Sequence, residues 1–166
     1  MKMIVRTLVI LLTIVATGIP AGAQSTSRIV GTWRVVSYDR EVVETKAISH
    51  GFGGNPMGLV TYTPDGRMML MIVDATRKPP AKPTATDAEA VGLYRTMIAY
   101  AGTYRVQGNE IIIHVEISSE QTTTGTDQTR SFKLDGDRLT TITTPLVSAF
   151  LNNQTVVTTV VWERVK

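Results

Sequence analysis

Residues 59–73, which read LVTYTPDGRMMLMIV, decide the fold class of this chain. Two runs of apolar and β-branched residues, 59–63 and 67–73, flank the turn sequence Pro64-Asp65-Gly66. Proline presets φ for a turn and glycine accepts a positive φ, so the sequence favours a tight reversal of the chain. The stretch therefore predicts two antiparallel strands joined by a hairpin.

Strand and turn signals continue to alternate along most of the chain. Gly108-Asn109 and Asp135-Gly136 mark two further turns. The predicted strands cover residues 31–43, 59–63, 67–73, 102–106, 110–118, 126–134, 138–144 and 155–165. Eight successive antiparallel strands predict an all-β, up-and-down barrel, which leaves no open sheet edge. Side chains fill the interior of such a barrel, or it holds one small ligand.

A change of period predicts one helix, residues 87–99, between the third and fourth of these strands. Thr86-Asp87-Ala88-Glu89 fits a capping box, and the apolar residues that follow share one helical face. The strand at 67–73 is apolar on both faces, so we expect the helix to cover its outer face or to cap a barrel mouth. Five methionines nearby indicate either ordinary packing or an adaptable ligand surface: Met57, Met68, Met69, Met71 and Met97.

The N-terminal residues predict a cleavable secretory signal peptide, residues 1–23, followed by one mature domain, residues 24–166. Lys2 and Arg6 supply the positive start, residues 8–15 the apolar core, and Ala21-Gly22-Ala23 the small-residue cleavage pattern. The apolar core is too short for a membrane span, which needs about 20 apolar residues. We therefore expect a periplasmic or secreted protein with no membrane span after cleavage.

Charge and cysteine content exclude several classes of protein. The net charge of the full chain is +3, and loss of Lys2 and Arg6 with the signal peptide lowers it to +1. The basic residues are scattered among acidic ones, so no nucleic-acid partner is expected. The chain has no cysteine, which excludes both disulfides and a lipid-modified cysteine, so a well-packed sheet has to hold the domain.

Several motifs occur in order along residues 29–166. They are Gly31-Thr32-Trp33, Gly58, YTPDGRM at 62–68, YAGTY at 100–104, HVE at 114–116 and WERV at 162–165. Together these motifs resemble the bacterial lipocalin-like domain family. The resemblance implies a lipocalin-type β-barrel around a central cavity, and it implies no defined activity. The helix and the missing disulfide depart from true lipocalins.

The resemblance also implies a structural role for Trp33. In lipocalins the opening tryptophan packs at the closed end of the barrel against an arginine from a late strand. Arg164 and Arg130 are both candidates for that arginine. A guanidinium over an indole ring is a cation–π contact of about 0.5–2 kcal/mol.

The strand at 110–118 leaves two interpretations open. Ile111, Ile113, Val115 and Ile117 alternate with the polar residues His114 and Glu116. Either the apolar face fills the barrel, or His114 and Glu116 line a polar cavity as a ligand anchor or an acid–base pair. Further polar groups for a cavity are expected from three residues on other strands: Tyr62, Tyr104 and Arg130.

Metal and covalent chemistry have little support in the sequence. The two histidines, His50 and His114, are 64 positions apart, and no serine lies in a Gly-x-Ser-x-Gly context. We therefore expect no metal and no cofactor. His50 lies in the glycine-rich loop at 49–58, as part of a mobile loop or as a gate that contacts ligand.

Three hypotheses on function follow. The first is an exported carrier or sensor of a small, largely apolar molecule bound in the barrel. The second is a barrel enzyme, an isomerase, cyclase or hydrolase, that uses His114. The third is a filled barrel that acts as an interaction module. The sequence does not decide the oligomeric state.

Overall fold

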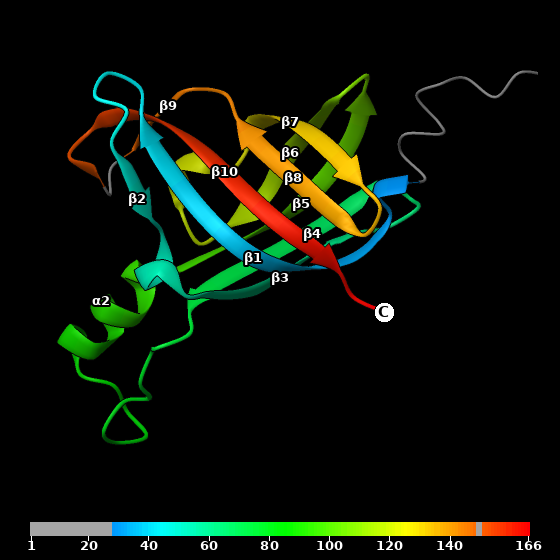
Figure 1. The fold of residues 1–166 in the computed structure, drawn as a ribbon. Helices are drawn as coiled ribbons and strands as arrows, with labels where there is room; N and C mark the ends of the chain where they lie inside the picture. The colour runs from blue at the N-terminus through cyan, green and yellow to red at the C-terminus, as the bar shows by residue number, and fades with distance from the viewer. Residues whose placement is uncertain (1–27, 149–150) are drawn as a thin grey trace, which may run out of the picture.

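The computed structural model describes residues 28–148 and 151–166, and the predicted signal peptide at 1–23 lies outside them. Its main element is a closed antiparallel barrel (Figure 1). The eight strands of the barrel are β1 (Gly31–Val42), β3 (Pro56–Tyr62), β4 (Arg67–Asp74), β5 (Met97–Gln107), β6 (Glu110–Ser118), β7 (Asp127–Asp135), β8 (Arg138–Thr143) and β10 (Gln154–Arg164). Each strand pairs with the next, and β1 pairs with β10, which closes the barrel and confirms the predicted architecture.

Two short strands extend one end of this barrel. β2 (Ile48–His50) pairs with β1, and β9 (Leu146–Ser148) pairs with β10. Two 3-10 turns, η1 (Phe52–Gly54) and η2 (Gln121–Thr123), join strands near the same end. We call it the open end, and the opposite end the closed end.

The helix differs from its prediction in length, place and packing. α2 (Asp87–Arg95) begins with the predicted capping box between Thr86 and Glu89, but it ends four residues early. Residues 97–101 pair with β4 instead and belong to β5, because ladder hydrogen bonds outweigh the helical pattern there. The helix follows β4, one strand later in chain order than predicted, because the short strand β2 was not among the predicted strands.

The closed half of the barrel is filled with apolar side chains. Trp33, Ile111, Ile113 and Leu139 are fully buried there. The Trp33 indole donates a hydrogen bond of 2.8 Å to the carbonyl of Ile29. Alternation on β3, β4 and β5 supplies most of the remaining core, as expected for strands with one face turned inward.

Arg164 lies over the Trp33 ring, 4.0 Å from the ring centroid. Its guanidinium also donates hydrogen bonds to the carbonyls of Val30 and Arg28, at 2.9 and 2.7 Å. Of the two arginines expected from the family resemblance, Arg164 thus occupies the place beside Trp33. Arg130 lies elsewhere, over the ring of Tyr100.

A β-bulge in β6 changes which side chains face inward. Gly102 pairs with Val115, but the preceding Ala101 pairs with Ile117, so Glu116 is the extra residue. As a result Glu116 and Ile117 both face outward, and Ile117 is 65% exposed. The prediction that Ile117 shares a face with Ile111 is wrong because strict alternation fails at this bulge.

Candidate functional site

The open half of the barrel contains a cavity of about 1090 Å³. Its walls come from the inner faces of β1, β5, β6, β7, β8 and β10, and α2, η1, η2 and β9 contribute residues at its rim. Figure 1 shows α2 and its preceding loop projecting from the barrel near the start of β5. The cavity is therefore built by the same strands that form the filled core, continued past the point where the core ends.

Apolar and uncharged polar side chains share the cavity surface. Ile98, Val115 and Val156 supply apolar surface, and Thr143 and Thr158 supply hydroxyl groups. Thr158 is itself buried, and its backbone amide donates a 2.9 Å hydrogen bond to Oγ1 of Thr143. Such a mixture suits a molecule with an apolar body and few polar groups.

Arg130 places a positive charge in this cavity. Its guanidinium lies 5.6 Å from the centroid of the Tyr100 ring. The Nη1 atom is buried and has no hydrogen-bond partner. Among the described residues, no carboxylate lies within ion-pair distance of Arg130. A buried donor without an acceptor is unfavourable, so the site is electrostatically incomplete without a bound molecule or water.

A second charged group lies on another wall. Arg40 lies against the rings of Tyr38 and Phe52, at 4.9 and 5.8 Å from their centroids. Glu120 lies near it, half-buried, and burial raises the pKa of this carboxyl while the charge of Arg40 opposes the rise. Arg40 and Glu120 thus form a pair of opposite charges in the cavity wall.

Two contacts organise the rim. The Asp74 carboxylate accepts hydrogen bonds from the hydroxyl and the amide of Thr76, at 2.7 and 2.8 Å, which lowers its pKa. The Tyr94 hydroxyl donates to the carbonyl of Ser119 at 3.0 Å and ties α2 to the end of β6. No residue of α2 is buried, so this hydrogen bond and the direct connection to β5 hold the helix at the mouth.

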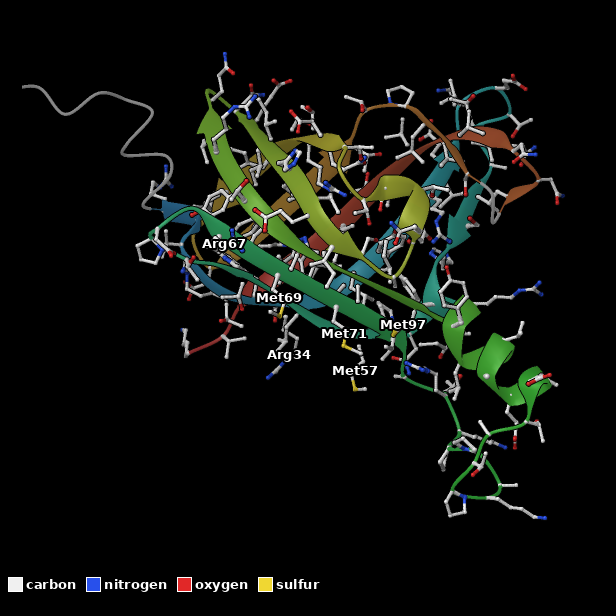
Figure 2. All side chains as sticks on the ribbon, turned by 180° about the vertical axis from the view of Figure 1, so that it is seen from behind. Arg34, Met57, Arg67, Met69, Met71 and Met97 are labelled. Atoms are coloured by element: carbon white, nitrogen blue, oxygen red, sulfur yellow. The ribbon has the colours of Figure 1, made fainter. Side chains whose placement is uncertain are left out.

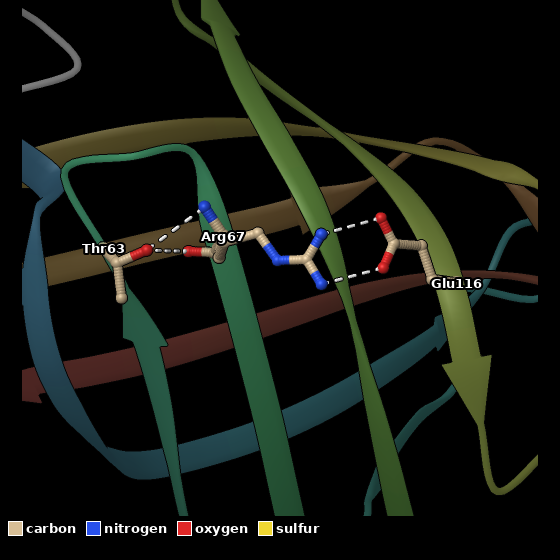
Figure 3. A network of polar contacts seen from close by, with 3 residues as sticks. All are labelled: Thr63, Arg67 and Glu116. Atoms are coloured by element: carbon tan, nitrogen blue, oxygen red, sulfur yellow. Dashed lines mark hydrogen bonds and ion pairs between the residues drawn. The ribbon is translucent and has the colours of Figure 1, made fainter.

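His114 and Glu116 lie on the outer wall of the barrel. His114 Nδ1 is 2.8 Å from Oδ1 of Asp127. Glu116 accepts two hydrogen bonds of 2.9 Å from the Arg67 guanidinium (Figure 3). Of the two interpretations left open for 110–118, the structure has the apolar face inside, and neither His114 nor Glu116 lines the cavity.

Tyr62 and Tyr104 lie in the filled half of the barrel. Their rings meet edge to face with centroids 4.9 Å apart, and the Tyr104 hydroxyl donates to the carbonyl of Thr63 at 2.9 Å. Burial raises the pKa of both phenols. Neither residue lines the cavity, so of the five candidate ligand-binding residues only Arg130 does.

Sequence reasoning missed Arg40, and a second bulge explains why. Counting outward from Trp33 by twos places Val35, Ser37 and Asp39 on the inner face. The register of β1 against β10 shifts between Val35 and Ser37, and Tyr38 and Arg40 then face inward. Gln128 also lines the cavity. The sequence could have predicted this, because Gln128 lies two residues from Arg130 on the same strand and therefore on the same face.

The outer face of β3 and β4 carries exposed methionines. Met57, Met69 and Met71 project from this face beside Arg34 (Figure 2). Met69 is 65% exposed, whereas its neighbour Met68 points into the core and is 3% exposed. Of the two positions expected for the helix, the outer face of this strand is wrong, because α2 lies at the rim of the cavity instead.

Comparison with known proteins gives the family. The model of the lipocalin-like domain family matches residues 30–165, which is nearly all of the described structure. The chain belongs to this family. A lipocalin-like barrel with an open cavity suits the binding of small molecules. No curated protein matches the chain in a sequence search.

Two further properties describe this lipocalin-like domain. Within residues 28–148 and 151–166, no helix has the length and apolar composition needed to cross a membrane. In the same part of the chain, no three His, Asp or Glu side chains are grouped so that they could hold a metal ion.

Proposed function

We propose that this lipocalin-like protein is exported and binds or carries a small, largely apolar molecule in its open-end cavity. The observation that carries the proposal is the cavity of about 1090 Å³ in a barrel whose other half is filled. Packed side chains would bury apolar surface in this half of the barrel, and that stabilisation is absent from an unfilled cavity. A bound ligand buries the same surface.

The cavity surface supports an apolar body in the ligand. Ile98, Val115, Val156 and Leu146 contribute aliphatic surface, and Tyr38, Phe52 and Tyr100 contribute aromatic rings. Transfer of an apolar molecule from water to such a surface gains roughly 25 cal/mol per Å² of apolar area buried. The hydroxyl groups of Thr143 and Thr158 leave room for a few hydrogen bonds that fix its orientation.

A pair of neighbouring substitutions tests binding inside the barrel. Thr158→Phe places an additional ring inside the cavity, whereas Thr159→Phe adds the same volume at the next residue of β10, which faces away from the cavity. With N-phenylnaphthylamine, a neutral fluorescent apolar probe, we expect Thr158→Phe to change the affinity measured from the fluorescence rise, and Thr159→Phe to bind the probe as wild type does. Equal binding by the two variants would place the probe outside the barrel and refute the proposal.

Export is supported by the N-terminal sequence. The charged start at Lys2 and Arg6, the apolar run at 8–15 and Ala21-Gly22-Ala23 favour cleavage before Gln24. Expression of the full chain in a Gram-negative host, followed by fractionation and mass measurement, tests this. A protein that starts at Gln24 in the periplasm or medium agrees with export. An uncleaved protein in the cytoplasm contradicts it.

The enzyme hypothesis has less support from the geometry. His114 lies outside the barrel beside Asp127 and does not line the cavity. The interaction-module hypothesis requires a filled barrel, and only the closed half is filled. Binding in the cavity is therefore the function that the arrangement of side chains favours most.

A further inference from the structure

We infer that the molecule bound in the cavity is amphipathic and carries one anionic group, a carboxylate or a similarly small oxyanion, that binds Arg130. This extends the proposed function and rests on it. The inference starts from an arginine whose charge the described residues leave unpaired in the wall of a large cavity.

Within the described part of the chain, the surroundings of Arg130 contain aromatic rings and hydroxyl groups but no anion. Tyr100 lies under its guanidinium, and Tyr62 is close enough for the two groups to interact electrostatically. Burial raises the pKa of both phenols, so they stay neutral and do not balance the charge. Arg130 therefore carries a full positive charge into a region of low polarity, where an anionic partner is worth most.

The two acidic residues of the cavity wall interact with groups other than Arg130. The charge of Arg40 acts on Glu120, and Asp74 accepts hydrogen bonds from the hydroxyl and amide of Thr76. Arg95, from the exposed last turn of α2, adds a further positive charge at the rim. The cavity thus has an excess of positive charge, and the buried positive charge is that of Arg130. An anionic ligand is favoured over a neutral or cationic one.

Neighbouring groups complete a site for an oxyanion. The guanidinium presents several N–H groups in a plane and matches the two oxygens of a carboxylate. Thr143 lies directly opposite Arg130 in the β7–β8 ladder, on the same inner face. Its Oγ1 accepts a hydrogen bond from the Thr158 amide, which leaves the hydroxyl proton for an incoming oxygen. Arginine and threonine together supply donors from two adjacent strands.

The position of Arg130 also sets the orientation of the ligand. Arg130 pairs with Ile111 on β6, which is fully buried in the filled half, so its guanidinium belongs to the floor of the cavity. Phe52, Tyr94 and Leu146 lie toward the mouth. The anionic group therefore enters first and lies deep, and the apolar body extends toward the mouth.

Calorimetric titration with matched ligands tests this inference. Octanoate, dodecanoate and hexadecanoate are compared with the alcohols of the same chain length, which lack the charge. Arg130→Met removes the guanidinium. Lys133→Met removes the same charge from the same strand, at an exposed residue of the outer face. We expect Arg130→Met to weaken alkanoate binding about tenfold or more, the usual effect of losing a charged hydrogen bond, and to leave the alcohols unchanged. Lys133→Met should alter neither.

The outcomes separate the two proposals. If the alcohols bind wild type but Arg130→Met weakens both ligand series equally, or neither, then the cavity binds apolar molecules and the anionic site is refuted. If no alkanoate and no alcohol binds wild type, both the anionic site and the proposed function are refuted. Arg130→Gln provides the same comparison if the methionine variant does not fold, and melting curves establish folding for each variant.

Discussion

The two halves of the barrel are built by the same strands, and they differ in what those strands turn inward. β1 contributes Trp33 to the closed half and Arg40 to the open half. β10 likewise contributes Trp162 and then Thr158, and β7 changes from partly buried apolar residues to Arg130. The change occurs partway along each inner face, so the boundary between the halves runs across the barrel.

This difference separates stability from binding within one sheet. The closed half buries large apolar side chains and offsets the conformational entropy lost on folding. The open half leaves space, a charged wall and a guanidinium without an anionic partner, all of which cost stability. Substitutions in the closed half should therefore lower stability and leave binding intact, and substitutions in the open half should change binding without lowering stability.

The largest effect is expected from Trp33→Ala. The substitution removes a fully buried indole and its hydrogen bond to Ile29, and it leaves Arg164 without the ring beneath it. We expect a loss of about 3–5 kcal/mol in the free energy of unfolding, measured with urea. Val36→Ala, at an exposed position of the same strand, should change it by less than about 0.5 kcal/mol. A loss below about 1 kcal/mol for Trp33→Ala would contradict a packed closed end.

The next effect concerns the bulge between β5 and β6. A Cβ added at Gly102 would lie 1.9 Å from the carbonyl oxygen of His114, so one strand has to shift. We expect Gly102→Ala to destabilise by about 1–3 kcal/mol. Gly92→Ala is the opposite case, because Gly92 lies in α2 with no atom within 4 Å of its added Cβ. Gly92→Ala should stabilise the protein by about 0.5–1 kcal/mol. Thermal melting should therefore give a lower melting temperature for Gly102→Ala and a higher one for Gly92→Ala.

Much of the closed half could be predicted from sequence, because its signals are local. The turn at 64–66 and the apolar alternation at 111–115 each specify their own conformation, and so does the capping box at 86–89 at the opposite end of the barrel. The cavity could be predicted only in part. The inward position of Arg40 and the outward position of Ile117 both follow from β-bulges, which arise from closure of the whole sheet and have no local signal.

Two arginines over aromatic rings provide a direct test of the contrast between the halves. Arg164→Met removes hydrogen bonds to two backbone carbonyls and the contact with Trp33, so we expect a loss of about 1–3 kcal/mol. Arg130→Met removes a partly buried charge for which residues 28–148 and 151–166 supply no anionic partner, so we expect a gain of about 1 kcal/mol. Urea unfolding measures both. Destabilisation by both substitutions would mean that Arg130 serves the fold as Arg164 does.

A smaller effect is expected from the ionisation of Glu120. Burial raises the pKa of this carboxyl in the folded protein. Its contribution to stability is therefore fully present below its unfolded pKa and is lost as the pH rises through its folded pKa.

In the same pH range, protonation of Glu120 removes a negative charge beside Arg40, so binding of an anion should tighten as the pH falls. We expect about a threefold change for dodecyl sulfonate, whose charge is constant, and none in Glu120→Gln. A pH dependence that survives this substitution would point to another group.

The smallest effect is expected on the outer wall, at the pair formed by Arg67 and Glu116. The two hydrogen bonds between these side chains have good geometry, but both residues are exposed to solvent (Figure 3). A double-mutant cycle with Arg67→Gln and Glu116→Gln should give a coupling free energy of about 0.2–1 kcal/mol, and high salt should reduce it. Ligand affinity should not change, because neither residue lines the cavity. A change in affinity would mean that strain at the bulge of Glu116 reaches Val115, which lines the cavity. The outer and inner faces of the sheet would then be energetically coupled at this bulge.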